Sequence, residues 1–124
     1  MKRAMTLQEC YAALEGNYED VLGRFCSERM VQKYVLKFLQ DGSYDTLCRA
    51  LASQSVEEAF RAVHTIKGMC LNLSFDRLAA SSIEMTEALR AGDLAGGLAL
   101  KERVDADYKQ TTDAIRTFQA GLPG

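Results

Sequence analysis

The sequence predicts an all-α protein, arranged as an antiparallel up-down four-helix bundle with additional short helices at its N-terminus. Apolar residues recur at intervals of three and four along most of the chain, which is the periodicity of helices that bury one face. No stretch shows the alternation that is typical of a β-strand. The connections between the helical stretches are short, and short connections favour antiparallel neighbours.

Length and composition indicate one folded domain. The chain has 124 residues, enough for one domain with a single core and too few for two. Hydrophobic residues make up 48% of it, so we expect it to fold rather than stay disordered. We assign residues 1–124 to this domain, with a helical N-terminal extension at about 6–25 and the bundle at about 27–120.

The charge and the apolar runs exclude several classes of partner. The net charge is −2, which gives no general attraction to nucleic acid or to anionic membranes. No apolar run approaches the roughly 20 residues of a membrane span, and the first residues lack the apolar segment of a signal peptide. We therefore expect a cytoplasmic, monomeric protein that binds neither nucleic acid nor membrane.

Two short helices are predicted near the N-terminus. Thr6 is a candidate N-cap with Glu9 three residues later, which is the spacing of a capping box, and Gly16 ends this helix. Asn17 begins a second short helix with Asp20 at its third position. The apolar positions of the two are Leu7, Cys10, Tyr11 and Leu14, then Val21, Leu22 and Phe25.

A longer helix and a further helix follow. Ser27 caps the first of them, and Asp41-Gly42-Ser43 separates it from the second, which runs from Tyr44 to about Ala52. Their inward residues are Met30, Val31, Tyr34, Val35, Phe38 and Leu39, then Leu47, Cys48 and Leu51.

Three helices are predicted in the second half of the chain. Ser55 and Glu58 have the spacing of a second capping box, and the helix that they begin should end near residues 72–74. The next helix spans 75–91, and the last opens near Asp93 with a first turn weakened by two glycines. Apolar positions in these last two helices are Leu78, Ile83, Met85 and Leu89, then Leu100, Val104, Tyr108, Ile115 and Phe118.

The helix that begins at Ser55 carries His64, the only histidine in the chain. At about 100° per residue, its apolar residues gather in one arc that we assign to the core: Val56, Ala59, Val63, Ile66 and Cys70. His64 lies beside this arc, with Arg61 and Gly68 on its outer side. Phe60, Lys67 and Leu71 lie between the ring and the core. The imidazole should therefore meet solvent.

These neighbours suit phosphoryl chemistry. An exposed imidazole is mostly neutral near pH 7 and can attack a phosphoryl group to form a covalent intermediate. The transferring group carries negative charge on three oxygens, which nearby cations stabilise. Arg61 and Lys67, three residues before and three after His64, stand next to it on a helix surface.

Gly68 needs a reason, because glycine in a helix interior costs about 1 kcal/mol relative to alanine. One reason is clearance, since the missing side chain opens room beside the ring for phosphate oxygens and for a partner. The other is a close contact between two helices.

The segment His64-Thr65-Ile66-Lys67-Gly68, followed by the apolar Leu71 and Leu73, resembles the phospho-acceptor motif of histidine phosphotransfer (HPt) domains. These are four-helix modules that carry phosphate between aspartates of receiver domains. The resemblance implies that His64 is the phospho-acceptor, Lys67 the neutralising cation and Gly68 the clearance residue. Arg61 and Thr65 would support them.

The resemblance also implies roles outside the motif. Family members often place a polar side chain of the following helix near the imidazole to orient it, and Thr86 and Arg90 share the face that could do so here. Phe60 and Leu71 would contribute apolar docking contacts. Ser74 stands where the family commonly has glycine, and Val63 where it commonly has alanine.

The expected function is that of a phosphoryl carrier rather than a kinase, because the chain has no glycine-rich nucleotide loop. Its partners would be receiver domains of response regulators or of a hybrid sensor histidine kinase. The receiver would supply Mg²⁺, so no cofactor is expected on this chain.

Three other interpretations remain open. The bundle could dock on a sensor kinase and regulate it without being phosphorylated. It could be a plain helical interaction domain in which His64 is incidental. The third, an enzyme with His64 as general base, has the least support, because no second histidine, paired carboxylates or nucleophile shares its face.

The four cysteines, at positions 10, 26, 48 and 70, form no Cys-x-x-Cys pair and fall within apolar helical patterns. A zinc site needs closely spaced ligands, and one histidine is available to complete it. We therefore expect no metal site and four cysteines that act as small buried apolar residues.

Overall fold

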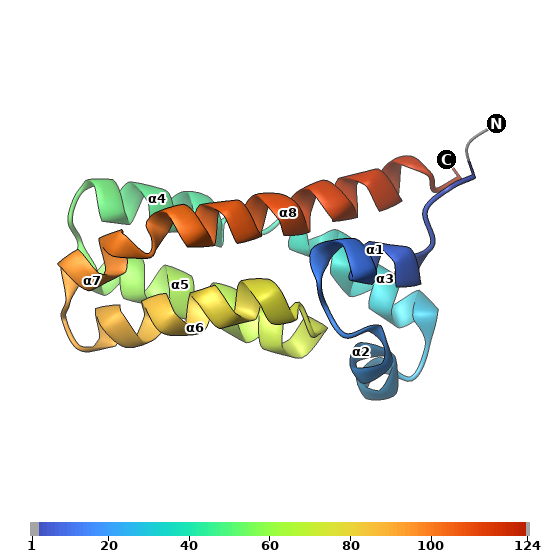
Figure 1. Ribbon diagram of the computed structural model, residues 1–124, viewed down its shortest axis with the longest axis horizontal. Helices are drawn as coiled ribbons and strands as arrows, with labels where there is room; N and C mark the ends of the chain where they lie inside the picture. Colours follow the sequence, from blue (N-terminus) through green and yellow to red (C-terminus); the bar gives the residue numbers. More distant parts are fainter. Residues whose placement is uncertain (1–2, 124) are drawn as a thin grey trace.

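The computed structural model describes residues 3–123, and every regular element within them is a helix (Figure 1), which confirms the all-α class. The helices are α1 (Leu7–Leu14), α2 (Tyr18–Phe25), α3 (Glu28–Phe38), α4 (Ser43–Ala52), α5 (Val56–Leu73), α6 (Asp76–Arg90), α7 (Leu94–Ala99) and α8 (Lys101–Ala120). In Figure 1, α4, α5, α6 and α8 run along the long axis of the molecule. The short helices α1, α2 and α3 gather at one end of this group, and α7 turns the chain at the other end.

Side-chain caps fix where the N-terminal helices begin. Thr6 and Glu9 form a complete capping box, in which the Glu9 amide donates to Thr6 Oγ1 (3.0 Å) and the Thr6 amide donates to Glu9 Oε1 (2.8 Å). Asn17 and Ser27 each accept a bond from the amide three residues ahead, at 3.0 and 3.2 Å. All three predicted starts are confirmed.

The second predicted capping box forms only in part. The Glu58 amide donates to Ser55 Oγ at 3.4 Å, so Ser55 does cap α5. The Ser55 amide, however, donates to the carbonyl of Ala50 at 2.8 Å and not to the Glu58 carboxylate. This carbonyl comes from the last turn of α4 and takes the place of the glutamate.

The predicted last helix is wrong as a single element, because the chain breaks at Leu100 into α7 and α8. Gly97 is buried, and a Cβ at this position would lie 2.7 Å from Leu89 Cδ2. Gly97 therefore allows α7 to pack closely against α6. After this contact the chain must turn before α8 can run back along the molecule.

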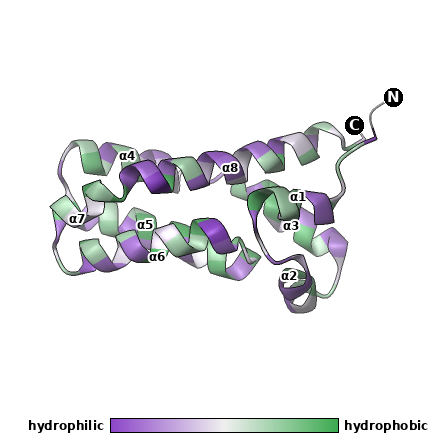
Figure 2. Cartoon of the chain, in the orientation of Figure 1, coloured by the Kyte–Doolittle hydropathy of each residue, from purple (hydrophilic) through white to green (hydrophobic). Residues whose placement is uncertain are grey.

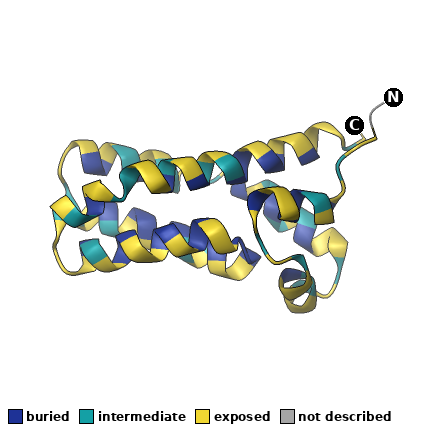
Figure 3. Cartoon of the chain, viewed as in Figure 1, coloured by how far each residue is buried: buried dark blue, intermediate teal, exposed yellow. Residues whose placement is uncertain are grey.

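The buried residues lie where the helices face one another (Figures 2 and 3). Most of the predicted inward positions are buried or half-buried. Met30 and Ile83 are corrections, since each is 37% exposed. Each lies beside the buried stripe of its helix, so that part of the side chain meets solvent.

The cysteines are only partly as predicted. Cys10 and Cys70 are buried, and burial raises the pKa of the Cys10 thiol to about 12 and also raises that of Cys70. Cys48 is half-buried. Cys26 is exposed, because it follows α2 as its C-cap in the left-handed conformation (φ 66°) and so turns away from the helix face. All four thiols are free.

The N-terminal helices close over the turn between α5 and α6. Tyr11 Oη donates to the carbonyl of Leu73 at 2.8 Å, and the Asn17 amide donates to the carbonyl of Ser74 at 2.9 Å. Ser74 is buried in the left-handed conformation (φ 57°), which explains why glycine suits this position. Its hydroxyl donates to Asp20 Oδ2 (2.6 Å) and accepts from Arg24 (2.9 Å), so contacts with α2 hold the serine there.

A second attachment joins α1 to α6 and α8. Arg77 contacts Glu15 Oε2 at 2.5 Å and Asp107 Oδ1 at 2.9 Å, and Asp107 is buried. Gln110 also donates to Glu15 Oε2 at 2.9 Å. None of the helices within residues 3–123 combines the length and the apolar character needed to cross a membrane.

A matched pair of glycine substitutions tests the closure over the turn. At Gly16 a Cβ would lie 2.5 Å from the carbonyl oxygen of Ser74, whereas at Gly23 it would meet nothing within 4 Å. We expect Gly16→Ala to lower the free energy of unfolding by about 1–3 kcal/mol through overpacking. Gly23→Ala should raise it by about 0.5–1 kcal/mol through helix propensity. Urea unfolding measures both, and equal effects would contradict the close approach.

The same attachments predict a loss of stability in acid. Bonds from Gln110 and Arg77 lower the pKa of Glu15 from its ordinary 4.5, and bonds from Ser74 and Arg24 lower the pKa of Asp20 from 3.8. A lowered native pKa stabilises the fold above the ordinary value, and this contribution is lost as the pH falls toward the native value. The free energy of unfolding should therefore decline below about pH 4.5. The double variant Glu15→Gln, Asp20→Asn should decline less steeply in urea titrations from pH 7 to 3.

Candidate functional site

His64 lies in the middle of α5 with its side chain at the surface, as the helical spacing predicts. The core stripe of this helix is confirmed, since Ala59, Val63, Ile66 and Cys70 are buried, and Val56 is half-buried at its start. One face of α5 thus fills the core and the other presents the imidazole.

The aromatic ring of Phe60 packs against the imidazole. The ring centroids are 5.6 Å apart with an interplanar angle of 35°. The guanidinium of Arg90, on α6, lies 5.0 Å from the centroid of the Phe60 ring. Arg90 also pairs with Glu87 at 3.5 Å, so it reaches the neighbourhood of His64 through Phe60.

The cations near His64 differ in their partners. Arg61 pairs with Glu57, one turn earlier on α5, at 3.0 Å. Both side chains are largely exposed, and an exposed ion pair of this kind contributes little energy. A competing anion can therefore displace Glu57 and bind Arg61. Lys67 is half-buried, and no ion pair with it occurs within residues 3–123. Its charge remains available to a ligand.

Gly68 leaves open space on the surface of α5. A Cβ at this position would meet nothing within 4 Å, so no neighbouring helix approaches it. This observation excludes the close helix–helix contact as the reason for the glycine. Gly68 therefore lies on the open side of α5, one turn after His64.

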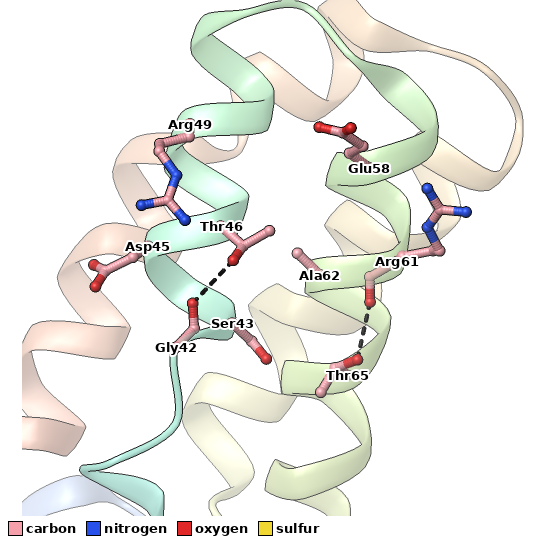
Figure 4. Close-up of a pocket in the computed structure, with 9 residues that line it drawn as sticks. All are labelled: Gly42, Ser43, Asp45, Thr46, Arg49, Glu58, Arg61, Ala62 and Thr65. Carbon is pink, nitrogen blue, oxygen red and sulfur yellow. Dashed lines mark hydrogen bonds between the residues drawn. The ribbon is translucent and has the colours of Figure 1, made fainter.

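Thr65 and Arg61 also border an open groove of about 610 Å³ between α4 and α5 (Figure 4). The Thr65 hydroxyl donates to the carbonyl of Arg61 at 3.0 Å, within its own helix. The lining is mostly polar and includes Arg49 and Glu58 from opposite walls. Thr65 therefore belongs to this groove, on the side of His64 away from α6.

Thr86 is a correction. Its side chain is fully buried, and its hydroxyl donates to the carbonyl of Ser82 at 2.6 Å. The single hydroxyl proton is therefore used inside α6, below the surface on which the imidazole stands. Of the two α6 residues expected to orient the ring, only Arg90 reaches the surface near it, and it does so through Phe60.

Apolar side chains extend this surface. Leu71 is 50% exposed, more than its expected place between ring and core would give. The contact between Phe60 and Arg90 marks the register of α5 against α6. Two turns away from that contact on each helix lie Lys67 and Ile83, and Ile83 is 37% exposed. The surface around His64 thus combines cations with exposed aliphatic groups.

Sequence reasoning missed the carboxylates of this surface and the exposure of Ile83. The spacings Glu57–Arg61 and Glu87–Arg90, four and three residues on one helix, were visible signals for the two ion pairs. Among residues 3–123, no three histidine, cysteine, aspartate or glutamate side chains gather as a metal site would require.

The model of the Hpt domain family matches residues 35–117, which is more than half of the chain. The match includes all of α4 to α7 and α8 as far as residue 117, and with them His64 and its neighbours. No curated protein and no solved structure matches the chain. The chain therefore belongs to the Hpt domain family, whose members serve phosphotransfer in two-component phosphorelays.

Proposed function

We propose that this protein is a phosphoryl carrier whose His64 accepts a phosphoryl group from the aspartyl phosphate of one receiver domain and passes it to the aspartate of another. The observation that carries the proposal is an exposed imidazole between Lys67, a cation without an ion-pair partner in residues 3–123, and the open surface at Gly68. The chain needs no nucleotide site for this role, because the partner brings the phosphoryl group. We take α4, α5, α6 and α8 as the antiparallel bundle that carries the site.

The transfer balances without a further reactant. A ring nitrogen of His64 attacks phosphorus, the nitrogen–phosphorus bond forms, and the bond from phosphorus to the aspartyl oxygen breaks. The aspartate leaves as a carboxylate, and the proton on the other ring nitrogen can pass to water. The second transfer is the reverse, with the carboxylate of the accepting receiver as nucleophile.

Charge on both sides of the ring favours this step. The transferring phosphoryl group carries negative charge on its three equatorial oxygens, and Lys67 can neutralise this charge from the α6 side of His64. Arg61 can leave its weak pair with Glu57 to do the same from the α4 side. The Mg²⁺ that such chemistry uses would belong to the receiver.

The receiver would dock over α5 and α6. Phe60, Leu71 and Ile83 offer apolar contacts around the charged centre, and this patch suits a small, transient interface. A hybrid sensor kinase and a response regulator would each present a receiver to the same surface in turn.

Replacing the phospho-acceptor tests the proposal directly. His64→Gln should abolish phosphorylation by a panel of Mg²⁺-loaded phosphorylated receivers while leaving the helical circular dichroism spectrum unchanged, because the side chain is exposed. The adduct on the wild type should be labile in acid and stable in base. Lys109→Gln, a substitution on the surface of α8, is the control and should be phosphorylated normally.

Full incorporation into His64→Gln would contradict the carrier role. Tight receiver binding by both wild type and His64→Gln, with no transfer to either, would instead favour a docking module.

A glycine series separates clearance from stability. Gly68→Ala should raise the free energy of unfolding by about 0.5–1 kcal/mol, as expected for Gly23→Ala, because neither Cβ meets a neighbour within 4 Å. Gly68→Gln should slow phosphoryl transfer at least tenfold, because its side chain fills the space beside the imidazole. Urea unfolding and rapid-quench transfer measure the two effects. Normal transfer by Gly68→Gln would show that clearance is not needed.

A further inference from the structure

We infer that Phe60 is the residue that positions the imidazole of His64, and that Arg90 holds Phe60 in place from α6. This inference rests on the proposed carrier function. It gives Phe60 a role in the transfer step itself, beyond an apolar contact with a partner.

The rings of Phe60 and His64 have the geometry of an attractive aromatic contact. Their centroids are 5.6 Å apart and the planes are inclined by 35°, within the 4.5–7 Å range of attractive aromatic contacts. The residues stand four apart on α5, so the helix backbone keeps the two side chains side by side. The contact therefore restrains the imidazole as long as the Phe60 ring itself is fixed.

Arg90 provides that restraint from a second helix. Its guanidinium lies 5.0 Å from the Phe60 ring centroid, within the roughly 6 Å of a cation–π contact. Glu87 pairs with the same guanidinium at 3.5 Å. Phe60 is half-buried and packs against the core, so the ring is held on several sides. Glu87, Arg90, Phe60 and His64 thus form one continuous set of contacts across the α5–α6 hairpin.

No side-chain hydrogen bond within residues 3–123 positions the imidazole of His64 in place of the ring contact. Within residues 3–123 no side chain donates to or accepts from the imidazole, and Thr86 is buried with its hydroxyl bonded to Ser82. The ring contact is therefore the side-chain interaction that selects among the rotamers of His64. A ring contact leaves both nitrogens free, which suits a group that must bond to phosphorus and then release it.

The expected effect lies in the maximal rate. A docked receiver fixes its phosphorus atom, so transfer requires the attacking nitrogen at one place and in one direction. Without Phe60 the imidazole samples several rotamers, and the productive fraction falls. Loss of a docking contact would instead weaken binding and leave the maximal rate unchanged.

The first test needs no phosphorylation. Because His64 is the only histidine, its ring protons give a single set of imidazole signals in NMR spectra. Phe60→Leu keeps an apolar side chain but removes the ring current, so these signals should move toward random-coil positions and the χ1 couplings should become averaged. Phe60→Tyr should restore both. Arg90→Met, which keeps the aliphatic stem, should have an intermediate effect.

The second test is rapid-quench transfer from a phosphorylated receiver at increasing receiver concentration. Phe60→Leu should lower the maximal rate about fivefold to tenfold with little change in the half-saturating concentration, and Phe60→Tyr should recover it. The matched controls are Phe25→Leu, which removes a ring stacked on Tyr34 at 5.2 Å, and Arg103→Met, which removes the ion pair with Glu84. Neither control should move the His64 signals or the rate.

Two outcomes would overturn the inference: unchanged His64 signals in Phe60→Leu, or a raised half-saturating concentration at an unchanged maximal rate. If the wild type accepts no phosphoryl group from any receiver, the proposed function fails. The NMR experiment still decides whether Phe60 holds the ring.

Discussion

The closure of α1 and α2 over the turn at Ser74 is the contact on which the functional surface depends. A non-glycine residue in the left-handed conformation is unfavourable by itself, and here hydrogen bonds with Asn17, Asp20 and Arg24 hold it in place. This turn sets how α6 returns along α5. The register in turn brings Arg90 over Phe60, and Phe60 lies beside His64. A contact far along the chain from the histidine thus defines its surroundings.

Within the site, charge and apolar packing have separate tasks. Arg61 and Arg90 are paired with carboxylates on their own helices, and these pairs keep cationic side chains near the ring without placing bare charge on the surface. Lys67 has no such partner within residues 3–123 and is the cation that we propose meets an incoming phosphoryl group. Phe60 contributes an apolar packing contact with the imidazole and no charge. The proposed chemistry uses all of these, although no hydrogen bond to the imidazole side chain occurs within residues 3–123.

Much of this could be predicted from the sequence, because the relevant signals are local. Side-chain caps at Thr6, Asn17 and Ser27 fix helix starts, and the 3.6-residue period separates His64 from the core stripe. The expected burial of Cys26 is a local error, since this residue is the left-handed C-cap of α2, but the two larger errors concern contacts between helices. The break at Leu100 follows from the packing of Gly97 against Leu89, and the burial of Thr86 follows from the register of α6. The spacing of residues along one helix predicts neither the break nor the burial, because each depends on packing against a second helix.

The open surface at Gly68 has a consequence for how such a protein can change partners. The outer positions of α5, including Gly68 and Leu71, contact solvent, while the core positions of the same helix carry its stability. Substitutions on the outer side therefore leave the buried packing of the core undisturbed, because sites that share no contacts act independently. Selection can adjust which receiver is recognised, residue by residue, without the fold passing through an unstable intermediate.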